Sequence, residues 1–339
     1  MNEGDLDKAC SVLLDECVRL TDTDDVLIVY DRFGSSLGEA ISEECDRRGL
    51  PHFAVFVSLD RQRRGKADRR LLRCISGSSA IITALSAADA GTGFRIDLID
   101  AALEAKARIV HMPGLEEVEF TSNVLGTDFS ELHRASTRLF EMLRHTDRFT
   151  VRTETASGKI HTLKLRRDSR PLHTCGGIAT PCEIINFPTG EVYFAPIEGK
   201  SSGTLVLNGS AENCIIGSND EVTLRFEDGL LQVDASTFAG GGDIDSLRKD
   251  LEAARIEHPC SMTLCEFGIG TNSEIKELCG ENVVDEKSLG TAHIAVGGNS
   301  VFDGRTICPY HHDLVFYPLS VEADGEILDW PWGDGADRR

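Results

Sequence analysis

Residues 25–59, DVLIVYDRFGSSLGEAISEECDRRGLPHFAVFVSL, decide the class of the first half of the chain. The runs 25–31 and 52–59 are short, apolar and rich in β-branched residues, which is typical of buried strands. The residues between them, 36–48, are expected to form a helix. Strands at 79–85 and 108–113 and a helix at 96–107 continue the alternation. Continuous apolar strands separated by helices predict a parallel sheet covered on both faces, in a Rossmann-like α/β domain.

The loop after the first strand, DRFGSSLG (31–38), lies where a phosphate-binding loop would lie in such a domain. It has neither the GxGxxG pattern of dinucleotide-binding folds nor the GK[ST] of a P-loop. We therefore predict a tight turn there.

The pattern changes near residue 147. Segment 149–168 consists of two alternating strands about an ASGK turn, and later Asn-Gly and Asp-Gly pairs separate further apolar strands. One helix is expected at 243–256. The sequence thus predicts an α/β domain over residues 1–146 and an α+β, mainly antiparallel domain over residues 147–339.

Composition narrows the class of partner. The net charge of −21 opposes binding to nucleic acid or to an anionic membrane, because both require a concentrated basic face. No apolar run approaches the roughly 18 residues of a spanning helix, and the start, MNEGDLDKAC, is acidic. We expect a cytoplasmic protein without nucleic-acid or membrane partners. Its 11 cysteines form no CxxC pair, so reduced thiols are predicted.

Four stretches place acidic or imidazole side chains among glycines and apolar residues, where they are costly to bury without a partner. They are NFPTGEVYFAP (186–196), CEFGIGTN (265–272), GTAHIAVGGN (290–299) and YHHDLVF (310–316). His311 and Asp313 are two residues apart on an expected strand, so both project from one face. A bound cation would offset the cost of burying these two side chains, because both could coordinate it.

The candidate ligands form a mixed nitrogen and oxygen set that suits Zn²⁺, Co²⁺, Mn²⁺ or Fe²⁺. They are Glu191, Glu266, His293, His311 and Asp313. Five ligands exceed what one catalytic metal with an open position takes, which favours two metals and a bridging carboxylate. Taken singly, each residue is more often structural, EFGIG and GGN are also compatible with turns, and the spacing matches no compact motif such as HExxH.

The same stretches resemble a known family. NFPTGEV, EFGIGTN, DEKSLGTAHIAVG (285–297) and the His-x-Asp of HHD occur in this order in the aminopeptidase T family of metallopeptidases. IVHMPGLEEVEF (109–120) and RTETASGKIHTLKL (152–165) also resemble that family's passage from an α/β into a β domain.

The resemblance implies a homodimeric exopeptidase in which the five candidate residues bind two divalent metals. Glu191 and Glu266 would be its catalytic carboxylates, and a metal-activated water would attack the scissile carbonyl of a peptide or a related amide. One position departs from the family. The family has a functional tyrosine seven residues after the histidine of GTxH, where this chain has Ser300. Tyr310 and Tyr193 are the candidates to replace it.

A second class resembles the same scaffold. The 2,5-dihydroxypyridine dioxygenases share the terminal His-x-Asp and use one Fe²⁺ in a two-His-one-carboxylate triad. They lack the glutamate of PTGEV and carry histidine at the position of Glu266, so the chain retains the peptidase ligand set. The third alternative is a family member that binds metal without catalysis.

Overall fold

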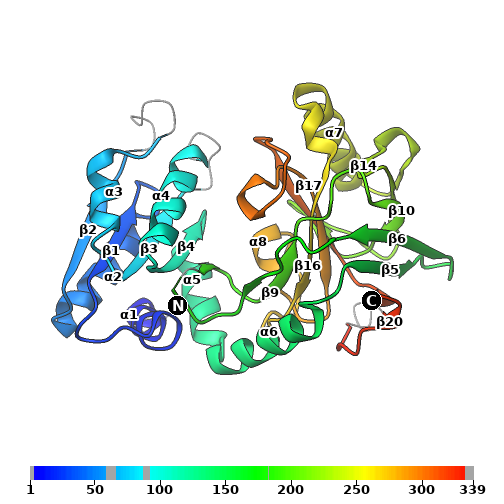
Figure 1. The fold of residues 1–339 in the computed structure, drawn as a ribbon. Coiled ribbons are helices and arrows are strands. Elements are labelled where there is room, and N and C mark those ends of the chain that lie inside the picture. Colours follow the sequence, from blue (N-terminus) through cyan, green and yellow to red (C-terminus); the bar gives the residue numbers. More distant parts are fainter. Residues whose placement is uncertain (1–3, 59–65, 87–91, 182, 333–339) are drawn as a thin grey trace. The chain divides into compact units, whose positions relative to one another are not determined.

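The computed structural model describes residues 4–58, 66–86, 92–181 and 183–332 (Figure 1). The chain forms two compact units. The first consists of Met1–Arg134 and Cys175–Thr189, and the second of Ala135–Thr174 and Gly190–Arg339. These units differ in two places from the contiguous division at residue 147. Residues 135–146 join the second unit, and Cys175–Thr189 returns to the first because it supplies a strand to the sheet there.

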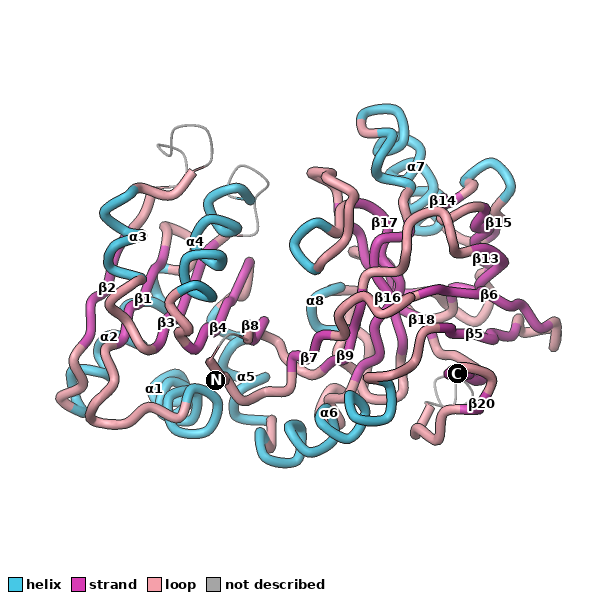
Figure 2. Tube along the Cα trace, viewed as in Figure 1, coloured by secondary structure: helices cyan, strands magenta, loops and turns pink. Residues whose placement is uncertain are grey.

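The first unit holds a five-stranded, wholly parallel sheet, as the alternating pattern predicts (Figure 2). Its strands, in spatial order, are β2 (His52–Phe56), β1 (Val26–Tyr30), β3 (Ala80–Leu85), β4 (Arg108–Pro113) and β8 (Ile184–Asn186). Its helices are α1 (Asp5–Val12), a π-helical turn (Leu13–Val18), α2 (Ser35–Arg48), α3 (Arg69–Ile75), α4 (Thr92–Glu104) and α5 (Glu117–Gly126).

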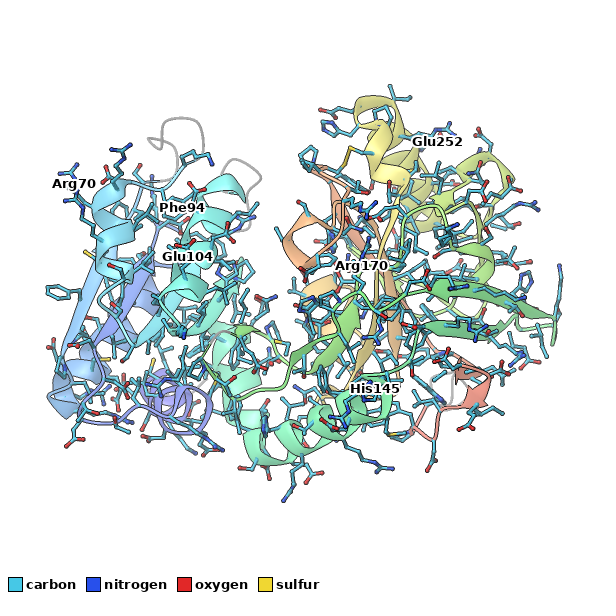
Figure 3. The ribbon with its side chains drawn as sticks, viewed as in Figure 1. Arg70, Phe94, Glu104, His145, Arg170 and Glu252 are labelled. Atoms are coloured by element: carbon cyan, nitrogen blue, oxygen red, sulfur yellow. A yellow bond between two sulfur atoms is a disulfide. The ribbon has the colours of Figure 1, made fainter. Side chains whose placement is uncertain are left out.

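Both faces of this sheet are covered. Along β1, Val26 and Ile28 pack in one apolar cluster with residues of α1, α2 and α5, whereas Leu27 and Val29 pack in another with residues of α3 and α4. Phe94 of α4 is fully buried in the second cluster (Figure 3). Strand β2 differs from the prediction of a buried strand, since it lies at the edge of the sheet and Phe53 is 74% exposed.

The loop after β1 is a tight turn held by its first residue. The Asp31 carboxylate accepts the backbone N–H groups of Phe33 and Gly34, both at 3.0 Å, and that of Ser86 at 2.9 Å. A β-carbon on Gly34 would overlap the backbone of Ala84. The absence of a side chain at Gly34 therefore allows this loop to lie close to β3.

The second unit contains two antiparallel sheets, as predicted for this half of the chain. One has the order β14 (Leu230–Leu231), β13 (Glu221–Glu227), β10 (Ser202–Leu207), β6 (Ile160–Arg166), β5 (Arg148–Glu154), β19 (Ser320–Ala323) and β20 (Glu326–Ile327), with β15 (Thr237–Ala239) paired to β13. The other has the order β12 (Cys214–Ile215), β11 (Ser210–Ala211), β18 (His311–Phe316), β17 (Ala292–Gly297), β16 (Leu264–Gly270), β9 (Glu191–Phe194) and β7 (His173–Cys175).

The helices around these sheets include the one expected from the sequence, α7 (Gly242–Glu257). The others are α6 (Phe129–Leu143), which continues into this unit, the short α8 (Asn282–Asp285) and 3₁₀ turns at Val233–Ala235, Pro259–Met262 and Ser300–Phe302. Within the described ranges, none of the chain's helices combines the length and apolar character that crossing a bilayer requires.

The two sheets enclose one apolar core. Phe149 on β5 contacts Phe194 on β9 and Phe267 on β16, with ring centroids 4.8 and 5.8 Å apart. Val192, Ile294 and other alternate residues of the second sheet belong to the same cluster. Because strand residues alternate between faces, the intervening residues of β9, β17 and β18 point away from this core. In β16 a register shift between Leu264 and Glu266 interrupts the alternation, and from Glu266 onward its residues alternate in the same way, with Phe267 and Ile269 in the core.

A disulfide joins Cys260 to Cys308, so the prediction of reduced thiols is wrong for these two residues. Cys260 lies on the 3₁₀ turn that precedes β16, and Cys308 lies in the segment that precedes β18. The two cysteines are 48 residues apart in sequence, so the pairing depends on the fold and not on a local motif.

Candidate metal centre

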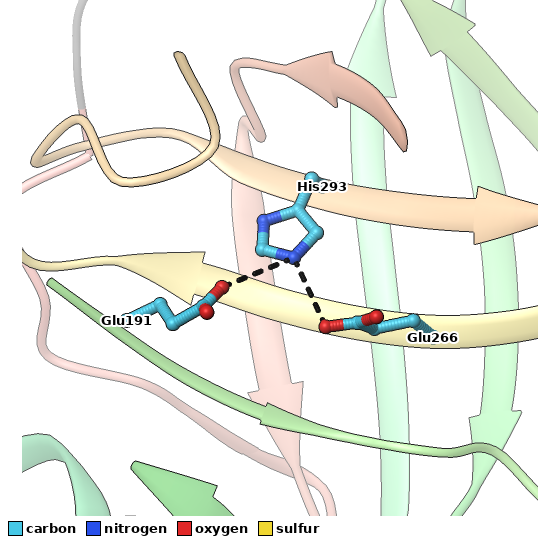
Figure 4. A group of neighbouring side chains, drawn as sticks. All are labelled: Glu191, Glu266 and His293. Atoms are coloured by element: carbon cyan, nitrogen blue, oxygen red, sulfur yellow. Dashed lines mark ion pairs between the residues drawn. The ribbon is translucent and has the colours of Figure 1, made fainter. Parts of the chain in front are cut away.

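The five candidate side chains lie on the face of the second sheet that points away from the core. Gly270 on β16 is opposite Glu191 on β9, and Gly268 is opposite His293 on β17. Ala295, two residues after His293, is opposite both Glu266 and Asp313, and Gly297 is opposite His311. This register brings side chains from four separate strands together. Figure 4 shows three of them, Glu191, Glu266 and His293.

Small residues between these side chains make room for them. A β-carbon on Gly268 would overlap Cε1 and Nε2 of His293, so the imidazole lies across the space that a side chain would fill. A β-carbon on Gly270 would overlap the Ser288 backbone. EFGIG is therefore part of a strand and not a turn, and its glycines allow close packing around the charged groups.

Two groups of possible ligands share one carboxylate. Position A comprises Glu191, Glu266 and His293, and position B comprises Glu266, His311 and Asp313. Within each group the ligand atoms lie within 4.8 Å of one another. Nε2 of His293 is 3.6 Å from Oε1 of Glu266, whereas Nε2 of His311 is 3.3 Å from Oε2 of the same carboxylate. Glu266 thus presents one oxygen to each position, as a bridging ligand would.

Several of these atoms are buried without a hydrogen-bond partner in the described parts of the chain. They are Oε2 of Glu191, Oδ1 of Asp313 and both ring nitrogens of His293. Oε2 of Glu191 is 3.5 Å from Nε2 of His293, and Oδ1 of Asp313 is 3.4 Å from Nε2 of His311. Buried polar atoms are costly unless they are paired. A divalent cation in each position would satisfy all of these atoms except Nδ1 of His293, so the donor set fits the expected metals.

The second histidine is oriented by the backbone. Nδ1 of His311 lies 3.1 Å from the carbonyl oxygen of Gly298, to which it can donate a proton, and this leaves Nε2 directed toward Glu266 and Asp313. Such a contact fixes the orientation of a ligand imidazole. The His311 side chain is 35% exposed, whereas that of His293 is fully buried. Position B is therefore the one that solvent reaches.

The pKa values of the cluster reflect the close approach of carboxylates and imidazoles in a buried site. Burial lowers the pKa of His293, but the carboxylates of Glu266, Glu286 and Glu191 outweigh it and raise the pKa to about 9. Burial raises the pKa of Glu266, but the neighbouring imidazoles of His293 and His311 outweigh it, so that pKa is lowered. In this state the imidazoles carry part of the positive charge that the carboxylates require.

Lys287 and Glu286, which were not among the residues predicted from the sequence, also belong to this cluster. The ammonium nitrogen of Lys287 is 2.5 Å from Oε1 of Glu191 and also contacts the carboxylate of Glu286. The side chains of Lys287, Glu191 and Glu286 are 3%, 4% and 12% exposed. DEKSLG has the composition of an exposed charged turn, so only the fold reveals this burial.

Charge counting among these residues calls for at least one divalent cation. Glu191, Glu266, Glu286 and Asp313 bring four negative charges when ionised, Lys287 brings one positive charge, and neutral imidazoles leave three negative charges. One divalent cation would leave one negative charge and two would leave one positive charge, while burial raises the pKa of Glu286 to about 8 and so reduces the negative charge at neutral pH. Glu286 could form a third group with His293 and Asp313, but those residues already serve positions A and B, and Lys287 contacts Glu286.

The ammonium of Lys287 also acts against a cation in position A. It contacts one oxygen of Glu191, and position A uses the other, so a single carboxylate would separate the two positive charges. Two unit charges 4 Å apart interact by about 4 kcal/mol at an effective dielectric constant of about 20, and the charge of a divalent ion doubles this.

Tyr193 and Tyr310, the two candidates to replace the family's tyrosine, lie on opposite faces of the second sheet. Tyr193 lies on the same face as Glu191, opposite Gly268, and its ring stacks on His173 with centroids 5.3 Å apart. Tyr310 stacks on His312, and both alternate with His311, so they point to the other face. Ser300 is exposed on its 3₁₀ turn. Of the two phenols, that of Tyr193 is on the side of the candidate ligands.

The amino-acid sequence matches no protein-family model and no curated protein sequence. Solved structures with a similar fold include the following two. One is a 2,5-dihydroxypyridine dioxygenase from Pseudomonas putida KT2440, with 16% identity, a TM-score of 0.70, and coverage of 96% of this chain and 97% of that one. The other is wild-type AmpT from Thermus thermophilus, with 17% identity, a TM-score of 0.56, and coverage of 96% and 99%. The resemblance to both scaffolds that the motifs indicate is thus confirmed in the fold.

Proposed function

We propose that the protein is a metal-dependent hydrolase of the aminopeptidase type, which removes N-terminal residues from peptides or cleaves a related amide. Two divalent cations would be held in positions A and B by Glu191, Glu266, His293, His311 and Asp313. The observation that carries the proposal is the Glu266 carboxylate, which directs one oxygen to His293 and the other to His311.

Such a cation pair supplies an activated water and a Lewis acid for the amide carbonyl. The protein supplies the placement of both. Glu266 sets the separation of the two positions, and the buried ring of His293 and the backbone-oriented ring of His311 fix a nitrogen ligand in each. Because position B is the more exposed, substrate would approach from the side of His311, where Phe302 contacts the imidazole edge-on at 5.9 Å. Tyr193, which contacts Phe302, is then the phenol available to the substrate.

A mononuclear iron dioxygenase is the second candidate. Ser300 in place of the peptidase tyrosine and the higher TM-score to the dioxygenase structure favour it. The ligand chemistry opposes it, because position B offers one imidazole and two carboxylates, whereas a facial triad for Fe²⁺ takes two imidazoles and one carboxylate.

Metal content and two activity assays, made on protein purified without chelators, distinguish the candidates. Two cations per chain with hydrolysis of leucyl or other aminoacyl p-nitroanilides in Co²⁺ or Zn²⁺ would support the proposal. One iron per chain with oxygen uptake on 2,5-dihydroxypyridine would replace it with the second candidate. Bound metal without either activity would identify a metal-binding protein.

A further inference from the structure

We propose that the two positions differ in their affinity for a cation, and that Lys287 causes the difference. Position B binds a cation first. Position A binds its cation more weakly, because the Glu191 carboxylate already pairs with the ammonium of Lys287. This inference rests on the proposed two-cation centre. It concerns the order and affinity of loading, which the number of ligands alone does not determine.

The first support is the placement of the ammonium. Lys287 lies 2.5 Å from Oε1 of Glu191, and Glu191 is a ligand of position A only. The ammonium also contacts the carboxylate of Glu286, and the Lys287 side chain is only 3% exposed, so burial keeps the charge beside Glu191. A cation in position A must therefore share Glu191 with a fixed positive charge.

The second support is the contrast with position B. Its carboxylates, Glu266 and Asp313, are contacted by the imidazole of His311, which is itself a ligand of position B. An imidazole coordinates a metal through a ring nitrogen, whereas an ammonium has no lone pair and cannot. The group beside the carboxylates of position B therefore joins the metal's ligands, whereas the ammonium beside Glu191 stays as a competing positive charge.

Lys287 could instead strengthen position A by orienting Glu191. The benefit of orientation is limited to the rotamer freedom of one side chain, and Glu191 is already packed in a strand at 4% exposure. The repulsion acts across one carboxylate in a buried site, where charges are weakly screened. Repulsion is the larger effect, so removal of the ammonium should tighten position A.

The test is a Co²⁺ titration of the chelator-stripped protein, followed by calorimetry and by visible absorption. The wild type should bind in two phases. In Lys287→Met the second phase should tighten at least tenfold, about 1.4 kcal/mol, while the first changes by less than about twofold. Lys276→Met removes an exposed lysine that lies 3.9 Å from Glu274 and should leave both phases unchanged.

Two further variants assign the phases. Glu191→Gln should abolish the second phase and keep the first, whereas His311→Ala should abolish the first. Lys287→Gln, which also removes the ammonium, should tighten the second phase in the same way and serves if Lys287→Met does not fold without metal.

A second phase that is weaker or unchanged in Lys287→Met and Lys287→Gln would overturn the inference. So would two wild-type phases of equal affinity. These results would leave the two-cation proposal intact. That proposal fails on a different result, namely wild-type protein that never binds more than one Co²⁺.

Discussion

Gly268 and His293 lie directly opposite each other on β16 and β17, and the imidazole occupies the space that a side chain at Gly268 would need. Gly268→Ala should push the ring out of position A, lower stability by about 1–3 kcal/mol through overpacking, and reduce bound metal to one per chain. Denaturant unfolding and elemental analysis measure both effects. Gly126→Ala, where nothing lies within 4 Å of the added carbon, is the matched control. Undiminished metal in Gly268→Ala would show that His293 does not hold it.

Glu266 should be the most damaging ligand to lose, because it belongs to both positions. Glu266→Ala is expected to bring bound metal below one per chain, whereas His311→Ala should retain one. Glu274→Ala, on the exposed segment after β16, should retain two. Elemental analysis of the three variants checks the order, and equal metal content in the Glu266 and wild-type proteins would refute the bridging role.

Removal of metal should destabilise the second unit, because its carboxylates then repel one another in a buried cluster. A cation at 100 times its dissociation constant stabilises the folded state by about 2.7 kcal/mol per site. Thermal unfolding with and without Zn²⁺ or Co²⁺ should therefore give a lower midpoint for the stripped protein. In Glu266→Ala the midpoint should be nearly independent of added metal.

Tyr193 should contribute to hydrolysis and Tyr310 should not, since only the former lies on the ligand face. A phenol that donates a proton or hydrogen bond in the transition state is worth about 10²-fold or more. Tyr193→Phe should lower kcat by about that factor with KM little changed, and Tyr310→Phe should be close to wild type. The reverse pattern would assign the role to Tyr310.

Acid should weaken the hydrogen bonds that the Glu198 carboxylate accepts beside the segment that leads to β18. The Glu198 carboxylate accepts from Arg170 at 2.7 Å, from Asn299 at 3.0 Å and from the Arg305 backbone at 2.8 Å (Figure 3 labels Arg170). Burial raises the pKa of Glu198, but Arg170 and these donors outweigh it and lower the pKa to about 2.

A lowered pKa means that the carboxylate stabilises the fold above its ordinary pKa near 4.5, and that this contribution is lost as pH falls from there toward 2. Glu198→Gln should cost about 1–2 kcal/mol at pH 7, and the cost should shrink progressively as pH falls from about 4.5 toward 2. Urea unfolding of metal-stripped wild type and variant across this range gives the difference. A difference that does not change with pH would contradict the assignment.

The sequence supports much of this fold because its signals are local. The apolar runs of β1, β3 and β4 and the alternating strands β5 and β6 appear where the patterns place them. Strand alternation predicts that His311 and Asp313 share a face, whereas the grouping of all five candidate ligands is what the resemblance to the aminopeptidase T family implies.

Other features depend on contacts between distant segments. Strand β8 is only three residues long, and nothing in Ile184–Asn186 indicates that it returns to the parallel sheet. The Cys260–Cys308 pair joins segments 48 residues apart. Lys287 resembles an exposed lysine until the neighbouring strands bury it against Glu191. Burial of a charge is a property of tertiary packing, which residue spacing does not encode.

Anomalous diffraction from crystals of the Zn²⁺- or Co²⁺-loaded protein tests the central claim most directly. We expect one anomalous peak on each side of the Glu266 carboxylate. One should lie beside Glu191 and His293, and the other beside His311 and Asp313. A single peak, or peaks away from Glu266, would contradict this claim.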